Sequence, residues 1–404
     1  MNKTKMLVVG ITMNCAGTEK SFLSFLSCLD FERFDVTLLL AKREGLLMDQ
    51  LPKQVKVRVM EKYGDMFLLS GRNAAKTLFD CFVKENPLTL FEIFPYFVKS
   101  LLYRGEKRAS AAYRMWVHFM QKMPGVEEEY DVAVAYWGDR TMFYMCDKVK
   151  AKKKIAWLHF DYSNPPRDDE LYGAYFARCD RVVTVSKLVD ESLKAKLPEI
   201  APRCVMMENI TNPRQIWDLA LRGETFPDNH FHGKRILTIG RIGDQKGLDL
   251  VIPVLKRLRD ENYDVRWYVL GDGETEYKQR LSEALLDAGV ADMMLFLGTT
   301  TNPYSYLRDC DIYAQPSRHE GKPISVEEAK IMYKPILATR YLSAPEQLED
   351  GELGVLCDIS SEGIYEGIKK LLDSPALCDR LTEKLSKRSF GNSGEIEKFY
   401  DMLK

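Results

Sequence analysis

The sequence predicts an α/β protein with two Rossmann-like domains that face a cleft. Three observations support this fold class: short apolar strands alternate with helical segments, the alternation restarts after a break at residues 209–213, and the chain has 404 residues. Strands that alternate with helices form parallel sheets through right-handed β-α-β units. At roughly 150 residues per domain, this length predicts two or three domains.

The first half of the chain supplies six of the predicted strands. Apolar runs such as MLVVGI are typical of strands buried on both faces, because helices cover both sides of a parallel sheet. We expect strands at residues 6–11, 34–41, 55–60, 130–137, 154–160 and 181–186, and a helix at residues 21–29.

After the break NITNP, the same pattern starts again. We expect strands at residues 235–241, 265–271, 293–298 and 312–317, and helices at residues 248–261, 276–289 and 302–309. Ligands of such sheets bind beyond the carboxyl ends of the strands, so the loops after the strands are where a site is expected.

The domain boundaries follow from this break. We expect an N-terminal domain over residues 1–212 and a C-terminal domain over residues 213–385. Residues 386–404 should contain a helix that crosses back onto the N-terminal domain. Its apolar side chains recur at helical spacing and need a surface to cover; they are Ile396, Phe399, Tyr400 and Leu403.

The composition is that of a soluble globular protein, with 46% hydrophobic and 29% charged residues. A net charge of −1 gives no field that would attract nucleic acid, which we therefore exclude as a partner. The nine cysteines are scattered, odd in number and without a C-x-x-C pair, which favours reduced thiols in a cytoplasmic protein. The N-terminal apolar run is too short for a signal peptide, and no run reaches the ~20 apolar residues of a membrane span.

Residues 66–123 depart from the alternation and predict a helical insertion in the N-terminal domain. Six bases and one acid lie between Lys99 and Lys122. Two interpretations stay open. Either an anionic membrane surface binds the bases and the aromatic side chains, making the protein peripheral on the inner face of the cell membrane, or the aromatic side chains fill a core. The aromatic side chains concerned are Phe94, Phe97, Tyr103, Tyr113, Trp116 and Phe119.

The stretch HEGKPISVEEAK places two acids eight residues apart, Glu320 and Glu328. Ser325 and Glu328 form an S-x-x-E pattern, which predicts a capping box at the start of a helix. That interpretation leaves Glu320, Gly321 and Pro323 unexplained. Glycine lets backbone N–H groups approach a polar ligand, and a helix N-terminus attracts anions. The stretch therefore favours a pocket for a ligand with phosphates and hydroxyls.

The stretch IGRIGDQKG offers cations for such phosphates. Arg241 ends a predicted strand, and Lys246 follows across a glycine turn. Guanidinium and ammonium groups are the usual partners of a diphosphate. Two solvated bases on a loop are the alternative, but their place after the first strand of the second domain favours function.

Four stretches then carry a resemblance: GRIGDQKGLDLVI, VLGDGETEYKQRL, LFLGTTTNPYSYL and PSRHEGKPISVEEAKIMYKPILAT. Their order and spacing over residues 234–354 resemble the sugar-donor blocks of retaining nucleotide-sugar glycosyltransferases of family 4, of the bacterial surface-polysaccharide type. The N-terminal stretches AGTEKS, WLHFDYS, VVTVSK and ENITNP match more loosely. The resemblance implies the GT-B fold and covers most of the chain except the insertion.

The resemblance also implies roles for individual residues. Glu328 would hold the ribose of the sugar donor, and Arg241 and Lys246 would hold its diphosphate. Glu320 and the backbone amides after it would hold the donor sugar. The donor-binding residues expected here also include Gly240, Gly321, Lys322, Pro323 and Ile324. The catalytic residues expected are thus Arg241, Lys246, His159 and Glu320.

Two further residues come from the N-terminal half. His159 would contact the donor sugar near the reacting carbon, and Gly17 would let the backbone approach the diphosphate or the acceptor. The family usually has two glycines where this chain has Ala16 and Gly17.

The implied reaction transfers a sugar from a nucleotide-diphosphate donor, with UDP-sugar expected first, to a saccharide or lipid-linked saccharide. Fixed cations stabilise the charge that develops on the leaving diphosphate, so neither a metal nor another cofactor is expected. His230 and His232 lie in a predicted loop and are more typical of a solvated turn than of a metal site. A sugar-nucleotide 2-epimerase and a non-catalytic nucleotide-sugar-binding subunit stay open as alternatives.

Overall fold

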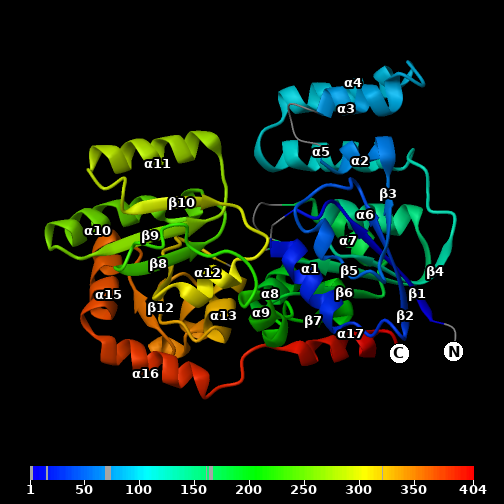
Figure 1. Cartoon of the computed structure of the whole chain (residues 1–404). Coiled ribbons are helices and arrows are strands. Elements are labelled where there is room, and N and C mark those ends of the chain that lie inside the picture. The colour runs from blue at the N-terminus through cyan, green and yellow to red at the C-terminus, as the bar shows by residue number, and fades with distance from the viewer. Residues whose placement is uncertain (1–2, 15–16, 69–73, 161, 163–166, 321) are drawn as a thin grey trace. The chain divides into compact units, whose positions relative to one another are not determined.

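The computed structural model describes residues 3–14, 17–68, 74–160, 162, 167–320 and 322–404. The chain divides into two compact units, coloured by residue number in Figure 1. Unit 1 comprises Met1–Ile210 and Gly394–Lys404, and unit 2 comprises Thr211–Ser393.

Unit 1 is built on a seven-stranded parallel sheet in the order β3-β2-β1-β4-β5-β6-β7. Its strands are β1 Thr4–Gly10, β2 Phe34–Leu40, β3 Lys56–Val59, β4 Glu129–Ala135, β5 Lys150–Leu158, β6 Arg181–Thr184 and β7 Cys204–Met206. The short β7 was not expected from the sequence, because three residues carry too little periodicity to be recognised.

Helices cover both faces of this sheet, as the unbroken apolar strands predict. Alternate residues of β1 enter different cores: Leu7 and Val9 pack with α5, α6 and α7, whereas Met6 and Val8 pack with α1 and α17. The helices are α1 Gly17–Cys28, α2 Gly64–Phe67, α3 Ala74–Leu78, α4 Thr89–Leu102, α5 Gly105–Met120, α6 Asp139–Lys148, α7 Asp169–Phe176, α8 Lys187–Lys196 and α17 Ile396–Met402.

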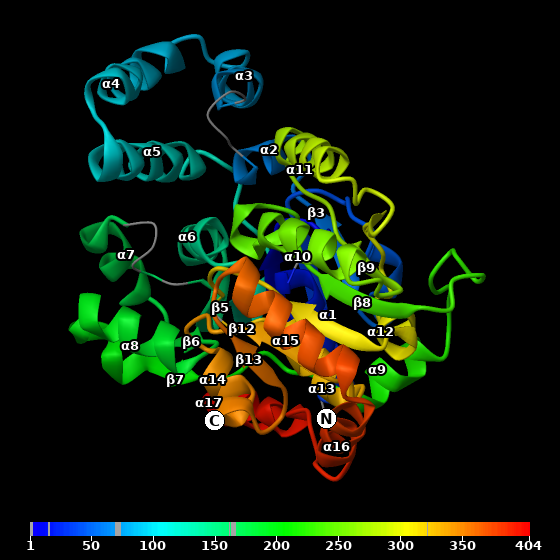
Figure 2. The same cartoon turned by 90° about the vertical axis from the view of Figure 1, so that its left-hand side faces the viewer.

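The helical insertion splits into an inner and an outer part. Trp116 and Phe119 of α5 are buried in the core of unit 1, so for these two residues the expectation of membrane contact is wrong. Figures 1 and 2 show α4 on the side of α5 away from the sheet. Phe94 and Phe97 of α4 are exposed. In the insertion, α5 therefore contributes aromatic side chains to the core of unit 1, whereas α4 exposes aromatic side chains on the surface.

Unit 2 contains a six-stranded parallel sheet in the order β10-β9-β8-β11-β12-β13. Its strands are β8 Lys234–Ile239, β9 Val265–Leu270, β10 Met294–Gly298, β11 Ile312–Gln315, β12 Ile336–Thr339 and β13 Val355–Cys357. The helices are α9 Pro213–Ala220, α10 Leu248–Asp260, α11 Thr275–Asp287, α12 Tyr304–Asp309, α13 Ile324–Ile331, α14 Ala344–Gln347, α15 Ser361–Asp373 and α16 Pro375–Ser386. One face packs on α10, α11 and α15, and the other on α9, α12 and α13 (Figure 2).

The C-terminal residues 394–404 belong to unit 1. In α17, the ring of Phe399 lies edge-on to Phe25 of α1, with centroids 5.0 Å apart. Tyr400 stacks on Phe34 at 5.8 Å, and its hydroxyl accepts a hydrogen bond from the Asp30 N–H at 2.9 Å. The apolar spacing of this segment therefore corresponds to a face that covers α1 and β2.

Candidate functional site

The strand order of unit 2 reverses at β8. Its successor in the chain, β9, pairs on one side, and β11 pairs on the other. The connections after β8 and β11 therefore leave the sheet in different directions. Such a switch point, at the carboxyl ends of parallel strands, is where ligands of open α/β sheets bind.

Two glycines shape the loop after β8. Gly240 has φ +153°, and a Cβ there would lie 2.5 Å from the Lys246 Nζ, so a side chain at this position would displace the end of the lysine. Gly247 has φ +64°, and a Cβ there would lie 2.2 Å from the Pro316 carbonyl oxygen. The glycines therefore bring the loops after β8 and β11 into contact.

Lys246 and Glu320 form an ion pair at this switch point. The Nζ lies 2.8 Å from the Glu320 Oε1, with side-chain exposures of 13% and 11%. The same oxygen accepts hydrogen bonds from the Gln315 Nε2 at 3.0 Å and the Ser317 hydroxyl at 2.8 Å. The Gln315 and Ser317 side chains are fully buried, which makes Glu320 a well-fixed carboxylate.

A second set of bonds ties the two loops together. Two guanidinium nitrogens of Arg318 donate hydrogen bonds to the Asp249 carboxylate, at 2.8 and 2.5 Å. The backbone N–H of Arg318 donates to the Gln245 carbonyl at 2.8 Å. The hydrogen bonds from the Arg318 guanidinium lower the pKa of Asp249. Bidentate pairs of this kind add geometric definition. None of these three residues was singled out from the sequence, since the pairing joins positions 69 residues apart.

The capping-box expectation at Glu328 is wrong. Helix α13 begins at Ile324, its N-cap is Pro323 without a side-chain cap, and Ser325 lies inside the helix with its hydroxyl 3.4 Å from the Gln315 Oε1. Glu328 is 3% exposed and accepts a hydrogen bond from the Tyr304 hydroxyl at 2.9 Å. Its burial therefore has a cause other than helix capping.

The remaining predicted residues of unit 2 lie in different environments. The Arg241 side chain is 80% exposed, with its nearest acid, Glu274, at 3.8 Å. Lys322 and Ile324 are half-buried and Pro323 is buried at the start of α13, whereas Gly321 lies outside the described residues. Lys246, Glu320 and Gly240 are thus in direct proximity, and Arg241 extends into solvent.

The predicted residues of unit 1 lie at its own switch point. Gly17 opens α1 after β1, and a Cβ there would meet nothing within 4 Å. His159 follows β5, and its ring lies 4.8 Å from that of Tyr136. Burial lowers the pKa of His159 to about 4, so the imidazole is neutral at pH 7. Its Nε2 has no hydrogen-bond partner among the described residues.

Two polar residues near these sites were missed in the sequence. Tyr304 holds Glu328, and Glu19 is a buried carboxylate in the first turn of α1. The signal for Glu19 was present: an acid two residues after Gly17, in the loop-to-helix segment where a ligand is expected. Tyr304 gave no signal, because its partner lies 24 residues away.

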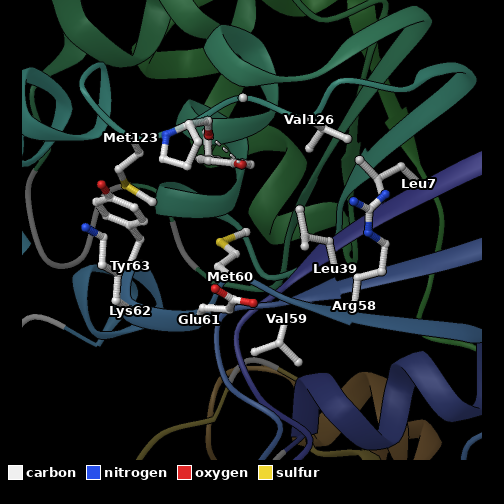
Figure 3. Close-up of a pocket in the computed structure, with 13 residues that line it drawn as sticks. Leu7, Leu39, Arg58, Val59, Met60, Glu61, Lys62, Tyr63, Met123 and Val126 are labelled. Atoms are coloured by element: carbon white, nitrogen blue, oxygen red, sulfur yellow. Dashed lines mark hydrogen bonds between the residues drawn. The ribbon is translucent and has the colours of Figure 1, made fainter.

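A separate pocket of about 250 Å³ lies in unit 1 (Figure 3). It is lined mainly by residues from β1 to β3, the turn after β3 and the loop 123–126, including Leu39, Met60, Tyr63 and Met123. These side chains belong to the core beneath the insertion rather than to a switch point.

In the described part of the chain there is no group of three or more His, Cys, Asp or Glu side chains placed to hold a metal ion. No helix over the same residues is long and apolar enough to cross a bilayer.

Comparisons with known proteins show which family and which folds this chain is similar to. Residues 225–388 match the family model described as glycosyl transferases group 1. A Haemophilus influenzae protein named as an uncharacterized glycosyltransferase is 26% identical over 261 residues, which are 62% of this chain and 69% of the relative. A Campylobacter jejuni N-acetylgalactosaminyltransferase named for a diphospho-undecaprenol-linked substrate is 25% identical over 221 residues, 54% of this chain and 58% of the relative. The chain thus spans less than two thirds of that second relative.

Solved structures show the fold over the whole chain. Anabaena Alr3699/HepE in complex with UDP and glucose has a TM-score of 0.66 at 15% identity, with 99% of each chain covered. A glycosyltransferase from Rickettsia africae has a TM-score of 0.67 at 14% identity, covering 100% of this chain and 98% of the other. The fold is therefore GT-B, and residues 225–388 are similar to the glycosyl transferases group 1 family.

Proposed function

We propose that this chain is a glycosyltransferase that moves a sugar from a nucleotide-diphosphate donor, UDP-sugar first, to a saccharide or lipid-linked saccharide in polysaccharide biosynthesis. The anomeric carbon loses its bond to the diphosphate oxygen and gains one to the acceptor hydroxyl, with retained configuration. The hydroxyl proton passes to the leaving diphosphate, and no metal takes part.

The Lys246–Glu320 pair is the observation that carries this proposal. A fixed cation at the switch point suits a diphosphate, and a fixed carboxylate beside it suits sugar hydroxyls. Glu328 would hold the ribose hydroxyls, Arg241 would reach the diphosphate from solvent, and the backbone of Lys322, Pro323 and Ile324 would line the sugar. His159 would contact the donor sugar, and Gly17 would admit the diphosphate or the acceptor.

The names of relatives support the acceptor class. The Campylobacter relative is named for a diphospho-undecaprenol substrate, and a Rhizobium meliloti relative, 27% identical over 150 residues, for lipopolysaccharide core biosynthesis. Both names describe saccharides carried on lipids. We extend this acceptor class to the present chain as part of the proposal.

A screen of nucleotide sugars tests the proposal. A ligand at 100 times its dissociation constant raises the free energy of unfolding by about 2.7 kcal/mol, which thermal unfolding detects. We expect a UDP-sugar to give the largest shift and to be transferred or slowly hydrolysed with retained configuration. Epimerised sugar donor would show the 2-epimerase instead, and binding without turnover would show the binding subunit.

We also propose that α4 docks the protein on an anionic membrane from the cytoplasmic side. Ile93 and Tyr96 of α4 face α5, and Glu92 bonds to His118 and Lys122. The opposite stripe is apolar at spacings of four and three residues and is more than half exposed; it comprises Leu90, Phe94, Phe97 and Leu101. Phe91, beside it, is 77% exposed. Contiguous exposed apolar surface of this kind is typical of an interaction site.

Unpaired bases accompany this stripe. Arg114 pairs with Asp168 and Lys122 with Glu92, so these two bases are already neutralised. The other four are exposed and make no ion pair within the described part of the chain; they are Lys99, Arg104, Lys107 and Arg108. Each base near an anionic leaflet contributes about 1 kcal/mol of attraction, which salt screens.

Co-sedimentation with vesicles tests the docking. We expect binding to vesicles that contain phosphatidylserine, and loss of binding at high salt. Changing Lys99, Arg104, Lys107 and Arg108 to Glu, or Phe91, Phe94 and Phe97 to Ser, should abolish it. The matched control changes four exposed bases of unit 2 to Glu: Arg214, Lys256, Arg280 and Lys370. Equal recovery of wild type with and without anionic vesicles would refute the docking and leave the sugar-transfer proposal intact.

A further inference from the structure

The ion pair between Lys246 and Glu320 depends on the positions of two separate loops. Lys246 lies in the loop after β8, and Glu320 lies in the loop after β11. These two strands are neighbours in the sheet, so their loops start side by side. A group that joins the two loops therefore sets how the ammonium group and the carboxylate face a ligand.

Arg318 joins the two loops through both its side chain and its backbone. Its guanidinium donates to the Asp249 carboxylate at 2.8 and 2.5 Å, and its Nη1 also donates to the Asp244 carbonyl at 2.7 Å. Its backbone N–H donates to the Gln245 carbonyl at 2.8 Å. A guanidinium that holds a carboxylate with two nitrogens fixes the orientation of both groups. We call Arg318, Asp244, Gln245 and Asp249 the Arg318 clamp.

One end of the clamp reaches the ion pair itself. The Gln245 Nε2 donates to the His319 carbonyl at 2.9 Å and lies 3.5 Å from the Glu320 Oε2. Gln245 and Lys246 belong to the same short 3₁₀ turn, and Arg318 precedes Glu320 by two residues. A shift of Arg318 would therefore displace Glu320 relative to Lys246.

The other end of the clamp is anchored in the body of unit 2. Asp249 lies in the first turn of α10, between Leu248 and Val251, which are buried in the core. The Tyr277 hydroxyl of α11 donates to the Asp249 Oδ1 at 3.2 Å. The clamp therefore fixes the loop after β11 relative to two helices of the unit.

The two loops differ in how much their own backbone holds them. In the loop after β8, the Lys246 N–H donates to the Gly243 carbonyl at 3.0 Å, and the Ile242 N–H donates to the Asp272 carbonyl at 2.9 Å. Over residues 317–320, the bond from the Arg318 N–H is the one backbone–backbone hydrogen bond to other described residues. Loss of the clamp should therefore displace Glu320 more than Lys246.

We propose that Arg318 is a positioning residue for the donor sugar. Through Asp249 and Gln245, it holds the loop after β11 so that the Glu320 carboxylate faces the sugar hydroxyls. The inference rests on the proposed function, which assigns the sugar to Glu320 and the diphosphate to Lys246. Arg318 acts through Glu320 and does not touch the ligand, because its guanidinium is bonded to Asp249 and Asp244. The clamp thus contributes to recognition of the sugar and leaves recognition of the diphosphate to Lys246.

Calorimetric titration of the full chain tests the clamp. The probes are UDP, UDP-glucose, UDP-galactose, UDP-N-acetylglucosamine and UDP-N-acetylgalactosamine. We expect Arg318→Gln and Asp249→Asn each to bind the UDP-sugar preferred by wild type about 10-fold more weakly, with UDP affinity unchanged. The double variant should lose no more than either single variant, because both remove the same interaction.

The matched control is Arg257→Gln. Arg257 donates to both carboxylate oxygens of Glu362 at 2.9 Å, in the same unit but between α10 and α15. This variant removes an ion pair of the same type without touching either loop. We expect its affinities for UDP and for the UDP-sugar to equal those of wild type.

The ratio of the two affinities separates positioning from a merely structural role. A structural role would lower the Tm and the fraction of chain that binds, but not the ratio of UDP-sugar to UDP affinity. Equal losses for UDP and UDP-sugar, no loss for either, or additive losses in the double variant would overturn the proposal. If Arg318→Gln fails to fold, Asp249→Asn carries the test, because it leaves the backbone bond of Arg318 in place.

Hydrogen exchange separates failure of the clamp from failure of the proposed function. In Asp249→Asn, peptides covering residues 316–320 should exchange their amide hydrogens faster than in wild type and in Arg257→Gln. Unchanged exchange would overturn the clamp, whatever the chain binds. Faster exchange in a chain that binds no nucleotide sugar would retain the clamp as the link between the loops and overturn the proposed function.

Discussion

The two units have the same strand order at their switch points but fill them with different chemistry. In unit 2, Lys246 and Glu320 neutralise each other, and Glu320 is surrounded by further hydrogen-bond donors. In unit 1, Glu19 and His159 each keep a buried polar atom without a partner among the described residues, and aromatic rings surround them. Under the proposed function, the charged network of unit 2 suits a charged diphosphate. The same topology can therefore carry different side-chain chemistry at its switch point.

Removing the cation of unit 2 should have the largest effect. Lys246→Met keeps much of the side-chain volume but leaves the developing charge of the diphosphate unopposed, so we expect turnover to fall about 10²- to 10³-fold. Arg241→Ala should also lower turnover by orders of magnitude, with little change in stability because Arg241 is exposed. Steady-state kinetics measures both. Lys256→Ala, an exposed base on α10, is the control, and full activity of Lys246→Met would place the diphosphate elsewhere.

Acid should lower the stability of unit 1 through protonation of His159. Its pKa of about 4 in the folded chain lies below the ordinary value of 6.5, so the unfolded chain binds more protons between these two values. Stability should therefore fall as pH drops from about 6.5 to 4, by at most about 3 kcal/mol. Glu19 acts in the opposite direction, because its raised pKa makes the folded chain bind more protons above pH 4.5.

Denaturant unfolding across this pH range, with His159→Asn and Glu19→Gln, separates the two contributions. The His159 variant should lose the acid-dependent fall in stability, and the Glu19 variant should steepen it. A wild-type stability that stays flat between pH 6.5 and 4.5, with both variants identical to it, would contradict the burial of these groups.

Glu328 provides a test within unit 2. Glu328→Gln should weaken nucleotide-sugar binding about 10- to 100-fold, because a carboxylate partner of the ribose hydroxyls is lost. The free energy of unfolding should fall by about 1 kcal/mol, since the hydrogen bond to Tyr304 is weakened. Calorimetric titration measures the affinity, and Glu327→Gln is the neighbouring control. Normal affinity with lowered stability would make Glu328 a structural residue.

The smallest effect is expected from chelation. Since Lys246 and Arg241 would supply the positive charge, added EDTA should leave turnover unchanged. Loss of activity that returns with added Mg²⁺ or Mn²⁺ would show that the cations of unit 2 are insufficient, and the metal-free mechanism would then be wrong.

The fold was predictable because it depends on local patterns. The strand at residues 265–271 and the helix at residues 248–261 lie within one residue of β9 and α10. Candidate site residues such as Glu320 could also be predicted, because the spacing between motif residues is visible in the sequence. The ion pair of Glu320 with Lys246 and the hydrogen bond of Glu328 with Tyr304 could not be predicted. Their partners are 74 and 24 positions apart in the sequence, respectively, and only the packing of the fold brings them together. The α4 and α5 aromatic residues show the same limit: their sequence predicts helices but not which helix faces the core.

The Lys246–Glu320 bond has a consequence for how a sugar donor is recognised. In the structure these two groups bond to each other, so under the proposed function a diphosphate would compete with Glu320 for the ammonium group of Lys246. If Lys246 then turned to the diphosphate, Glu320 would lose its cation and could accept hydrogen bonds from sugar hydroxyls. The nucleotide and the sugar would then bind with positive coupling, each removing a cost for the other. An intact UDP-sugar should bind more tightly than the separate affinities of UDP and free sugar predict, so that the ion pair itself discriminates substrate from product.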